Sequence, residues 1–338
     1  MKAIVTTSAS PFHYGHLDLY NKSIDIFGED TVRVVIGKNS KKEADFEQTL
    51  YHIIPYKVNY EITQDITLAD YCKKNEIKYI VRGIRNSLDA EYELKLAFLN
   101  KEINGDLDVV FFPTEHIFCN ISSSSIAELL KYQKFDVVKK YMNVDAMYRF
   151  YNKKPKFVVF FGKSCIGKSC YLNKVFNGKD IANSDEILWK VFEKLHGKEK
   201  MEAIKQESYD LIFGGKNIVD LIKIYSDERF WNEFFGFIEQ NYVKHDLSEH
   251  INLKGENNVY IVDFASIGVY WDTVPADLRG KMYLVKLENS DENRQKYITS
   301  KKFEEKIIHL DKNYKDPHYF DMIRNIDNYE DSVSKHLY

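Results

Sequence analysis

The feature that most limits the fold of this chain is an alternation, over residues 1–150, of short β-rich runs with segments of helical periodicity. The β-rich runs are KAIVTT, TVRVVIG, VNYEIT, KYIVRG and DVVFFP, and the helical segments run from His16 to Phe27, from just after Glu43, and over LADYCKKNE and DAEYELKLAFLNKEI. A strand reaches a parallel neighbour only through a crossover, so this alternation is typical of parallel sheets. We therefore predict an α/β domain with a doubly wound parallel sheet over residues 1–150.

A second domain is predicted from residue 156 to residue 338. The polar stretch YNKKPK at 151–156 interrupts the alternation, and FVVFFGKSCIGKS then begins a new strand, loop and helix. The two halves show no internal repeat, so we expect two different α/β units.

Composition excludes several classes of partner. The 48 Lys and Arg residues balance 51 Asp and Glu residues, and the formal charge of −3 predicts neither a nucleic-acid nor a membrane partner. The four cysteines show neither metal-ligand nor disulfide spacing, and no apolar run approaches the length of a membrane span. We expect a cytoplasmic protein that binds small molecules, and the sequence leaves a homo-oligomer open.

The stretch SASPFHYGH, residues 8–16, lies where the first strand passes into the first helix. This turn is predicted at the carboxyl edge of the sheet, where open α/β folds bind ligands. Gly15 would let the backbone approach a phosphate, the helix N-terminus would supply free N–H groups, and His13 and His16 would add donors. The stretch predicts a nucleotide-phosphate site, and the alternative is that the two histidines are surface residues of a turn.

With these residues in view, the first domain resembles the nucleotidyltransferase superfamily, with its Rossmann-like fold, and most closely the phosphopantetheine adenylyltransferases. The resemblance lies in SASPFHYGH, SKKEADF, VRGIRNSLDAEYE and FCNISSSSI, which follow one another in family order. It implies that Ser8, His16, Gly83, Arg85, Glu93, Ser122, Ser123 and Ser124 bind ATP and that Ser8, Lys41, Leu68 and Arg82 bind the second substrate. His13 is assigned to ATP binding from its place in the turn. It also implies AMP transfer from ATP to 4′-phosphopantetheine, with His16, Lys41 and Arg85 as catalytic donors that stabilise charge on the α-phosphate.

Three other interpretations of these motifs stay open. His13 departs from the adenylyltransferase pattern, and a full H-x-G-H is commoner in nicotinamide-nucleotide adenylyltransferases and cytidylyltransferases. The serines could serve only as an N-cap cluster. Arg82 and Arg85 could be surface ion-pair partners of Asp89 or Glu91.

The second domain opens with GKSCIGKS, residues 162–169, which fits the P-loop pattern and stands between an apolar run and a predicted helix. Gly162 and Gly167 would free the backbone to wrap phosphates, Lys168 would reach the β- and γ-phosphates, and Ser169 would hold Mg²⁺. ATP and Mg²⁺ are therefore the expected cofactors.

Downstream stretches resemble dephospho-coenzyme A kinases. The resemblance implies that Asp185, in DIANSDEILWKVFEKL, orients the acceptor hydroxyl and that Asp263, ending VYIVDFAS, is a Mg²⁺ partner; ordinary cap or strand-end carboxylates are the alternative. Family lid arginines correspond to Lys296 and Lys301 or to a shifted Arg294 in LENSDENRQKYITSKK.

The two resemblances together imply a bifunctional enzyme that makes dephospho-coenzyme A and then phosphorylates it. Two alternatives remain. One is a fusion of a nicotinamide-nucleotide adenylyltransferase with a ribosylnicotinamide kinase, and the other is an adenylyltransferase with a non-catalytic nucleotide-binding module.

Overall fold

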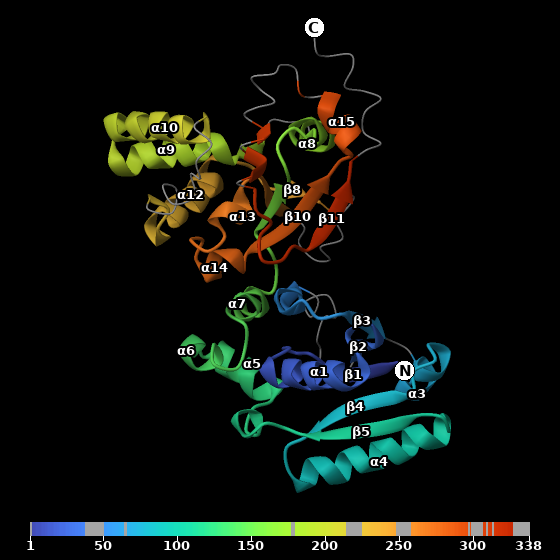
Figure 1. The fold of residues 1–338 in the computed structure, drawn as a ribbon. Coiled ribbons are helices and arrows are strands. Elements are labelled where there is room, and N and C mark those ends of the chain that lie inside the picture. The colour runs from blue at the N-terminus through green and yellow to red at the C-terminus, as the bar shows by residue number, and fades with distance from the viewer. Residues whose placement is uncertain are drawn as a thin grey trace. The chain divides into compact units, whose positions relative to one another are not determined.

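The computed structural model divides the chain into two compact units, Met1–Lys153 and Lys154–Tyr338 (Figure 1). The residues it describes are 2–37, 51–63, 66–176, 180–213, 225–247, 258–296, 298, 307–308, 310–312 and 314–326. The helix predicted after Glu43 begins outside the described residues.

The first domain is built on a five-stranded parallel sheet in the order β3-β2-β1-β4-β5. The strands are β1 (Ala3–Thr7), β2 (Val32–Gly37), β3 (Tyr60–Thr63), β4 (Tyr79–Ile84) and β5 (Asp108–Pro113). Ala3 pairs with Val32 on one side and with Tyr79 on the other, so β1 is the central strand. The predicted doubly wound parallel sheet is confirmed.

Helices cover both faces of this sheet. They are α1 (Tyr14–Phe27), α3 (Leu68–Lys74), α4 (Ser87–Ile103), α5 (Ser123–Lys131), α6 (Phe135–Val138) and α7 (Val144–Asn152), with short 3₁₀ turns η1 (Glu29–Thr31), η2 (Ile54–Tyr56) and η3 (His116–Phe118). Successive residues of a strand point to opposite faces. Val5 accordingly packs in the core with α1 and α5, and Ile4 packs in the core with α3.

The prediction for the first helix is confirmed. Leu17, Tyr20, Ile24 and Phe27 all pack against the same core cluster as Val5.

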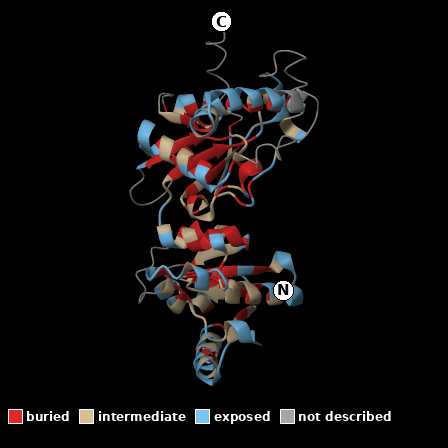
Figure 2. Ribbon diagram, turned by 90° about the vertical axis from the view of Figure 1, so that its left-hand side faces the viewer, coloured by how far each residue is buried: buried red, intermediate tan, exposed pale blue. Residues whose placement is uncertain are grey.

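The second domain holds a second parallel sheet, in the order β11-β10-β6-β9-β7, and Figure 2 shows its central strands as buried. The strands are β6 (Phe157–Phe161), β7 (Ile181–Asn183), β9 (Asn258–Asp263), β10 (Met282–Glu288) and β11 (Met322–Asn325), with the short β8 (His245–Asp246) antiparallel to β9. The helices are α8 (Lys168–Phe176), α9 (Ser184–His196), α10 (Lys198–Phe213), α12 (Glu228–Asn241), α13 (Ile267–Tyr270), α14 (Ala276–Arg279) and α15 (Asp291–Lys296). Within the described residues, no helix combines the length and apolarity that crossing a membrane requires.

Replacing two different glycines of the second domain by alanine should change the free energy of unfolding in opposite directions. A Cβ on Gly268 would lie 1.9 Å from the backbone oxygen of Lys315, whereas a Cβ on Gly236, inside α12, would meet nothing within 4 Å. We expect Gly268→Ala to lower the free energy of unfolding by about 1–3 kcal/mol and Gly236→Ala to raise it by about 0.5–1 kcal/mol.

All three tryptophans, Trp189, Trp231 and Trp271, lie in this domain, so urea unfolding followed by tryptophan fluorescence reports it alone. Equal stability of the two variants would contradict the packing described around Gly268.

Candidate functional site

A pocket of about 370 Å³ opens at the carboxyl ends of β1 and β4, the two strands at which the strand order of the first sheet reverses. It is lined by Thr6, Thr7, Ser8, His13, Gly15, His16, Leu19, Arg82, Gly83, Arg85, Asp89, Glu93, Thr114, Phe118, Ile121, Ser122, Ser123 and Ser124. Most residues that the sequence assigned to nucleotide binding therefore meet in one pocket.

The loop between β1 and α1 is fixed by Phe12, which is completely buried. Its backbone N–H donates to His52 Nε2 at 2.9 Å, and its carbonyl accepts from the hydroxyl of Tyr56 at 3.1 Å. Because both backbone groups are held, the following residue enters α1 in one orientation.

That following residue, His13, is the N-cap of α1. Its Nδ1 accepts the N–H of Gly15 at 3.1 Å, as a capping side chain does. A Cβ on Gly15 would lie only 3.0 Å from Cε1 of His13. Gly15 thus makes room for the capping ring, a role that the sequence reasoning, which gave it to phosphate approach, did not foresee.

His16 completes the capping box. Its Nδ1 accepts the backbone N–H of His13 at 3.2 Å, so the neutral ring carries its proton on Nε2, which lies 3.0 Å from Thr7 Oγ1. In both histidines the Nδ1 atom accepts a backbone N–H, which assigns a donor Nε2–H to each neutral ring.

His13 is buried, and burial together with the nearby positive charge of Arg85 lowers the pKa of its imidazole to about 4. It is therefore neutral at pH 7. Its contribution to a bound phosphate would be a hydrogen bond, without a formal positive charge.

Arg82 projects from β4 and pairs with Glu93 of α4. Its Nε lies 2.7 Å from Glu93 Oε2, and Nη2 contacts Oε1. Its Nη1 also donates to the carbonyl and hydroxyl of Thr6. Both residues line the pocket, with the guanidinium already balanced by a carboxylate.

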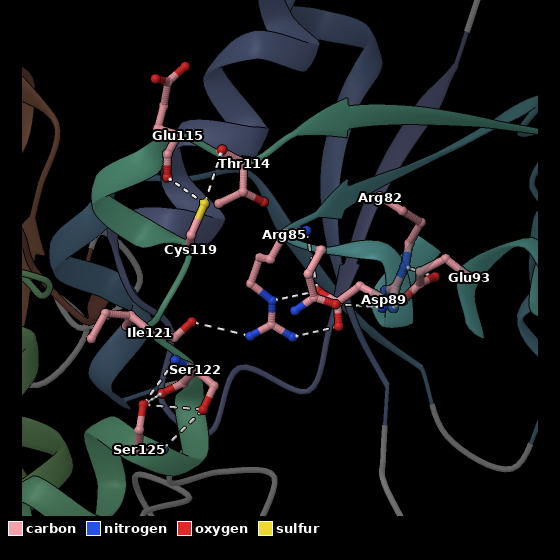
Figure 3. Close-up of polar contacts among 11 residues, drawn as sticks. Arg82, Arg85, Asp89, Glu93, Thr114, Glu115, Cys119, Ile121, Ser122 and Ser125 are labelled. Atoms are coloured by element: carbon pink, nitrogen blue, oxygen red, sulfur yellow. Dashed lines mark hydrogen bonds and ion pairs between the residues drawn. The ribbon is translucent and has the colours of Figure 1, made fainter. Parts of the chain in front are cut away.

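Arg85 makes the ion pair that the sequence allowed as an alternative. Its Nε donates to Asp89 Oδ2 at 2.6 Å and its Nη2 to Oδ1 at 3.1 Å, and this pairing lowers the pKa of Asp89. Nη1 reaches the carbonyl of Ile121 at 3.3 Å (Figure 3). Glu91, the other partner considered, pairs with Lys95 instead.

The serine cluster caps α5 and lines the pocket at once. Ser122 accepts the N–H of Ser125 at 3.1 Å and forms a capping box with it (Figure 3). Ser123 donates to the carbonyl of Pro11 at 2.9 Å, which ties α5 to the loop before α1. The N-termini of α1 and α5 therefore meet at this pocket, and both present positive dipole ends to it.

Two predicted residues of the first domain lie elsewhere. Lys41 falls outside the described residues. Leu68 begins α3, packs half-buried against the core cluster of Ile4, and is not among the residues that line this pocket, so its place at the acceptor site stays a prediction.

Several pocket residues were missed by the sequence reasoning. Thr6 and Thr7 hold Arg82 and His16, and Thr114 lies 3.2 Å from where a Cβ of Gly83 would stand. The Thr-Thr pair at a strand end was a usable signal, because hydroxyls at a carboxyl edge can reach groups in the crevice.

The P-loop of the second domain lies between β6 and α8, as predicted. Gly162 has a φ of +154°, and its Cβ would lie 2.6 Å from the carbonyl oxygen of Leu287. Gly167 has a φ of +86° just before α8 begins, and Cys165 between them is also left-handed, at +58°. Both glycines are required by the backbone itself.

Three of the predicted phosphate and metal residues meet at this loop. Lys168 forms an ion pair with Asp263 at the end of β9, and Ser169 Oγ lies 3.3 Å from Asp263 Oδ2. Burial lowers the pKa of Lys168 to about 8, which the negative charge of Asp185 opposes. Asp185 is exposed in the first turn of α9.

Side chains after β10 hold the P-loop backbone. Arg294 Nε donates to the carbonyl of Ser164 at 2.8 Å while its guanidinium pairs with Asp311, and Asn289 donates to the carbonyl of Ile166 at 2.8 Å. The carbonyls on both sides of Cys165 are thus fixed. Lys301 lies outside the described residues, as does the side chain of Lys296.

With this geometry in place, the comparisons define the class of the first domain. Residues 4–129 match the family model described as Cytidylyltransferase-like, so this part of the chain is a cytidylyltransferase-like nucleotidyltransferase domain. The second domain, which lies outside the matched residues, carries the P-loop of residues 162–169.

Two solved structures align over nearly the whole chain. One is titled "Crystal structure of NadR protein in complex with NR" (13% identity, TM-score 0.31, all of this chain and 92% of the other). The second is titled "Crystal structure of NadR protein in complex with NAD and AMP-PNP" (11% identity, TM-score 0.31, 96% of this chain and 90% of the other).

The protonation of His13 is directly testable. We expect NMR of histidine-labelled protein to place its pKa near 4, and Arg85→Met to raise that pKa because a nearby positive charge is removed. Arg33→Met is the control, because Arg33 of β2 pairs with Glu61 of β3. This change should leave the pKa of His13 unchanged.

The lowered pKa of His13 makes the stability of the fold depend on pH. A pKa lower in the folded than in the unfolded state means that the unfolded chain binds more protons between pH 6.5 and 4. The contribution of His13 to the free energy of unfolding is complete above pH 6.5. Between pH 6.5 and pH 4 it falls by about 1.4 kcal/mol for each unit by which the pH is lowered. A His13 pKa near 6.5 would contradict the buried, capping position.

Proposed function

We propose that the first domain is an adenylyltransferase that transfers AMP from ATP to the phosphate of a phosphomonoester acceptor and releases pyrophosphate. The observation that carries the proposal is the convergence of two helix N-termini, two imidazoles and two arginines on one pocket. Such a set of donors suits a polyphosphate whose charge is redistributed during the reaction.

The reaction needs no protein nucleophile. An oxygen of the acceptor phosphate attacks the α-phosphorus of ATP, the bond from that phosphorus to the bridging oxygen breaks, and pyrophosphate leaves with the electron pair. His16 Nε2–H, Arg85 and Lys41 would donate to the α-phosphate, and Ser122, Ser123 and Ser124 would bind phosphates through the start of α5.

For the acceptor we propose 4′-phosphopantetheine, which would give dephospho-coenzyme A. The resemblance of residues 81–93 and 118–126 to the phosphopantetheine adenylyltransferases supports it. A second candidate, nicotinamide mononucleotide, is favoured by His13, whose ring lies against that of His16 with centroids 3.9 Å apart.

His16→Ala should reduce adenylyl transfer by about 100-fold or more, because it removes a donor to charge that develops in the transition state. His116→Ala, at an exposed histidine of η3, is the matched control and should keep full activity. The assay is the release of pyrophosphate from ATP with the acceptor present, and circular dichroism verifies the fold.

The same assay with each acceptor at matched concentration identifies the substrate. Faster turnover of 4′-phosphopantetheine supports the main proposal, and faster turnover of nicotinamide mononucleotide transfers it to the second candidate. Full activity of a folded His16→Ala protein would refute adenylyl transfer at this pocket.

For the second domain we propose transfer of the γ-phosphate of ATP to a hydroxyl of the nucleotide product made by the first domain. Lys168 would bind the β- and γ-phosphates, and Asp185 would accept a hydrogen bond from the acceptor hydroxyl. The oxygens of Ser169 and Asp263 fit the donor set that Mg²⁺ prefers. When bound there, Mg²⁺ would neutralise phosphate charge.

Lys168→Ala should abolish phosphoryl transfer to dephospho-coenzyme A, since it removes the buried cation beside the phosphates. Lys163→Ala, at an exposed lysine of the same loop, is the control and should keep phosphoryl transfer. Asp185→Asn should retain ATP binding and lose turnover, as followed by mass spectrometry of the product.

Two outcomes would contradict this kinase proposal. ATP binding without any transfer to dephospho-coenzyme A or to ribosylnicotinamide would leave a non-catalytic nucleotide-binding module. Unchanged turnover in Lys168→Ala would place the reaction elsewhere.

A further inference from the structure

Two side chains that follow β10 contact the P-loop from outside the loop. β10 lies parallel to β6, so its carboxyl end reaches the point where the P-loop begins. Asn289, directly after β10, donates from Nδ2 to the carbonyl of Ile166 at 2.8 Å. Arg294, in α15, donates from Nε to the carbonyl of Ser164 at 2.8 Å. Both contacts end on backbone oxygens, so they act on the path of the loop backbone.

Each of these two donors is held in place by a second partner. Oδ1 of Asn289 accepts the backbone N–H of Ser290 at 2.9 Å, which leaves Nδ2 as the donor to the loop. Nη1 and Nη2 of Arg294 each lie 2.8 Å from an oxygen of Asp311, and only 11% of the Arg294 side chain is exposed. All three nitrogens of this guanidinium therefore have protein partners. Arg294, one candidate for a lid arginine, is thus engaged with the loop backbone and with Asp311.

The two contacted carbonyls determine where two N–H groups of the loop point. In a trans peptide group the C=O and the N–H point in opposite directions. The carbonyl of Ser164 shares its peptide group with the N–H of Cys165, so holding that carbonyl toward Arg294 turns the N–H the other way. The same relation joins the carbonyl of Ile166 with the N–H of Gly167. Contacts on the outer side of the loop thereby aim two N–H groups at its inner side.

The backbone between the two contacts is one that needs such support. Cys165 has a φ of +58° and Gly167 a φ of +86°. Left-handed residues within a turn gather successive N–H groups into a concave surface that binds anions. A residue with a side chain is disfavoured at a positive φ and keeps it only where its surroundings fix the backbone. The two contacts lie on either side of Cys165 and supply that restraint.

We propose that Asn289 and Arg294 are positioning residues, which hold the P-loop in its phosphate-binding conformation before the nucleotide arrives. They act through the loop backbone, by aiming the N–H groups of Cys165 and Gly167. A loop that is already in the bound conformation loses less entropy when it binds, so removing either contact should weaken the binding of ATP. The inference rests on the proposal that the second domain binds ATP at its P-loop, and it does not depend on the acceptor.

Isotope labelling of the cysteine amides in the full chain, measured by NMR, reports on this loop by itself. The chain has four cysteines, and Cys165 lies inside the P-loop. Its signal is the one that disappears in Cys165→Ser protein. Titration with MgATP, followed at this signal, gives a Kd for the P-loop even if ATP also binds the first domain. We expect the wild-type signal to shift as MgATP is added.

Two substitutions that leave the charge of the chain unchanged test the two contacts. Asn289→Ala removes the donor to the loop, and Arg294→Lys keeps the positive charge without the fork of donors that reaches both partners. Each should raise the Kd for MgATP by about 10-fold, the effect of losing one hydrogen bond. Asn232→Ala and Arg229→Lys, at exposed residues of α12, are the matched controls and should leave the Kd unchanged.

A further measurement separates positioning from a loss of stability. Arg294→Lys should move the Cys165 signal before any nucleotide is added, because Arg294 holds the peptide group that carries this N–H. Urea unfolding followed by tryptophan fluorescence should show that both variants are folded under the conditions of the titration. The Kd is then read from folded protein alone.

The outcomes distinguish this inference from the proposed kinase reaction. A wild-type Cys165 signal that does not respond to MgATP would overturn both. The same Kd in wild type and in either variant would overturn the positioning role of that residue and leave the kinase proposal in place. A rise in Kd of equal size in the α12 controls would likewise overturn the positioning role.

Discussion

Parallel pairing of β1 with both β2 and β4 is the constraint on which the first domain depends. Parallel strands must be joined by crossovers, so the carboxyl ends of β1 and β4 share one edge and the chain leaves them in opposite directions. The crevice between these exits is the pocket. The loop after β1 brings His13 and His16 to it, and the end of β4 brings Arg82 and Arg85. In the second domain, the neighbouring parallel strands β6 and β9 likewise end at one edge of their sheet. Lys168, after β6, forms an ion pair there with Asp263, at the end of β9.

In both sites the arginine and lysine side chains form ion pairs with carboxylates before any ligand is bound. Arg82 pairs with Glu93, Arg85 with Asp89, and Lys168 with Asp263. Such pairs fix the positions of long side chains, which lowers the entropy lost when they bind a phosphate. They also leave the described groups of the first pocket close to electrically neutral, because His13 is uncharged at pH 7. Attraction for an anionic ligand then comes from helix N-termini and N–H donors.

Helix α4 positions both arginines of the first pocket. Its Asp89 pairs with Arg85 and its Glu93 pairs with Arg82, so the first half of one helix sets the direction of both guanidinium groups.

The sequence by itself determined the parallel α/β architecture, the position of the P-loop and most of the residues of the first pocket. These features could be predicted because each depends on a local sequence pattern. The patterns are strand and helix periodicity, glycines that need a positive φ, and polar residues just after a strand. Tertiary structure decided which groups pair. It packed the half-buried Leu68 against the core cluster of Ile4, left room beside Gly15 for the His13 ring, and made Asp89 instead of Glu91 the partner of Arg85. Spacing alone could not settle these choices, because they depend on side-chain directions and burial that exist only when the elements are packed.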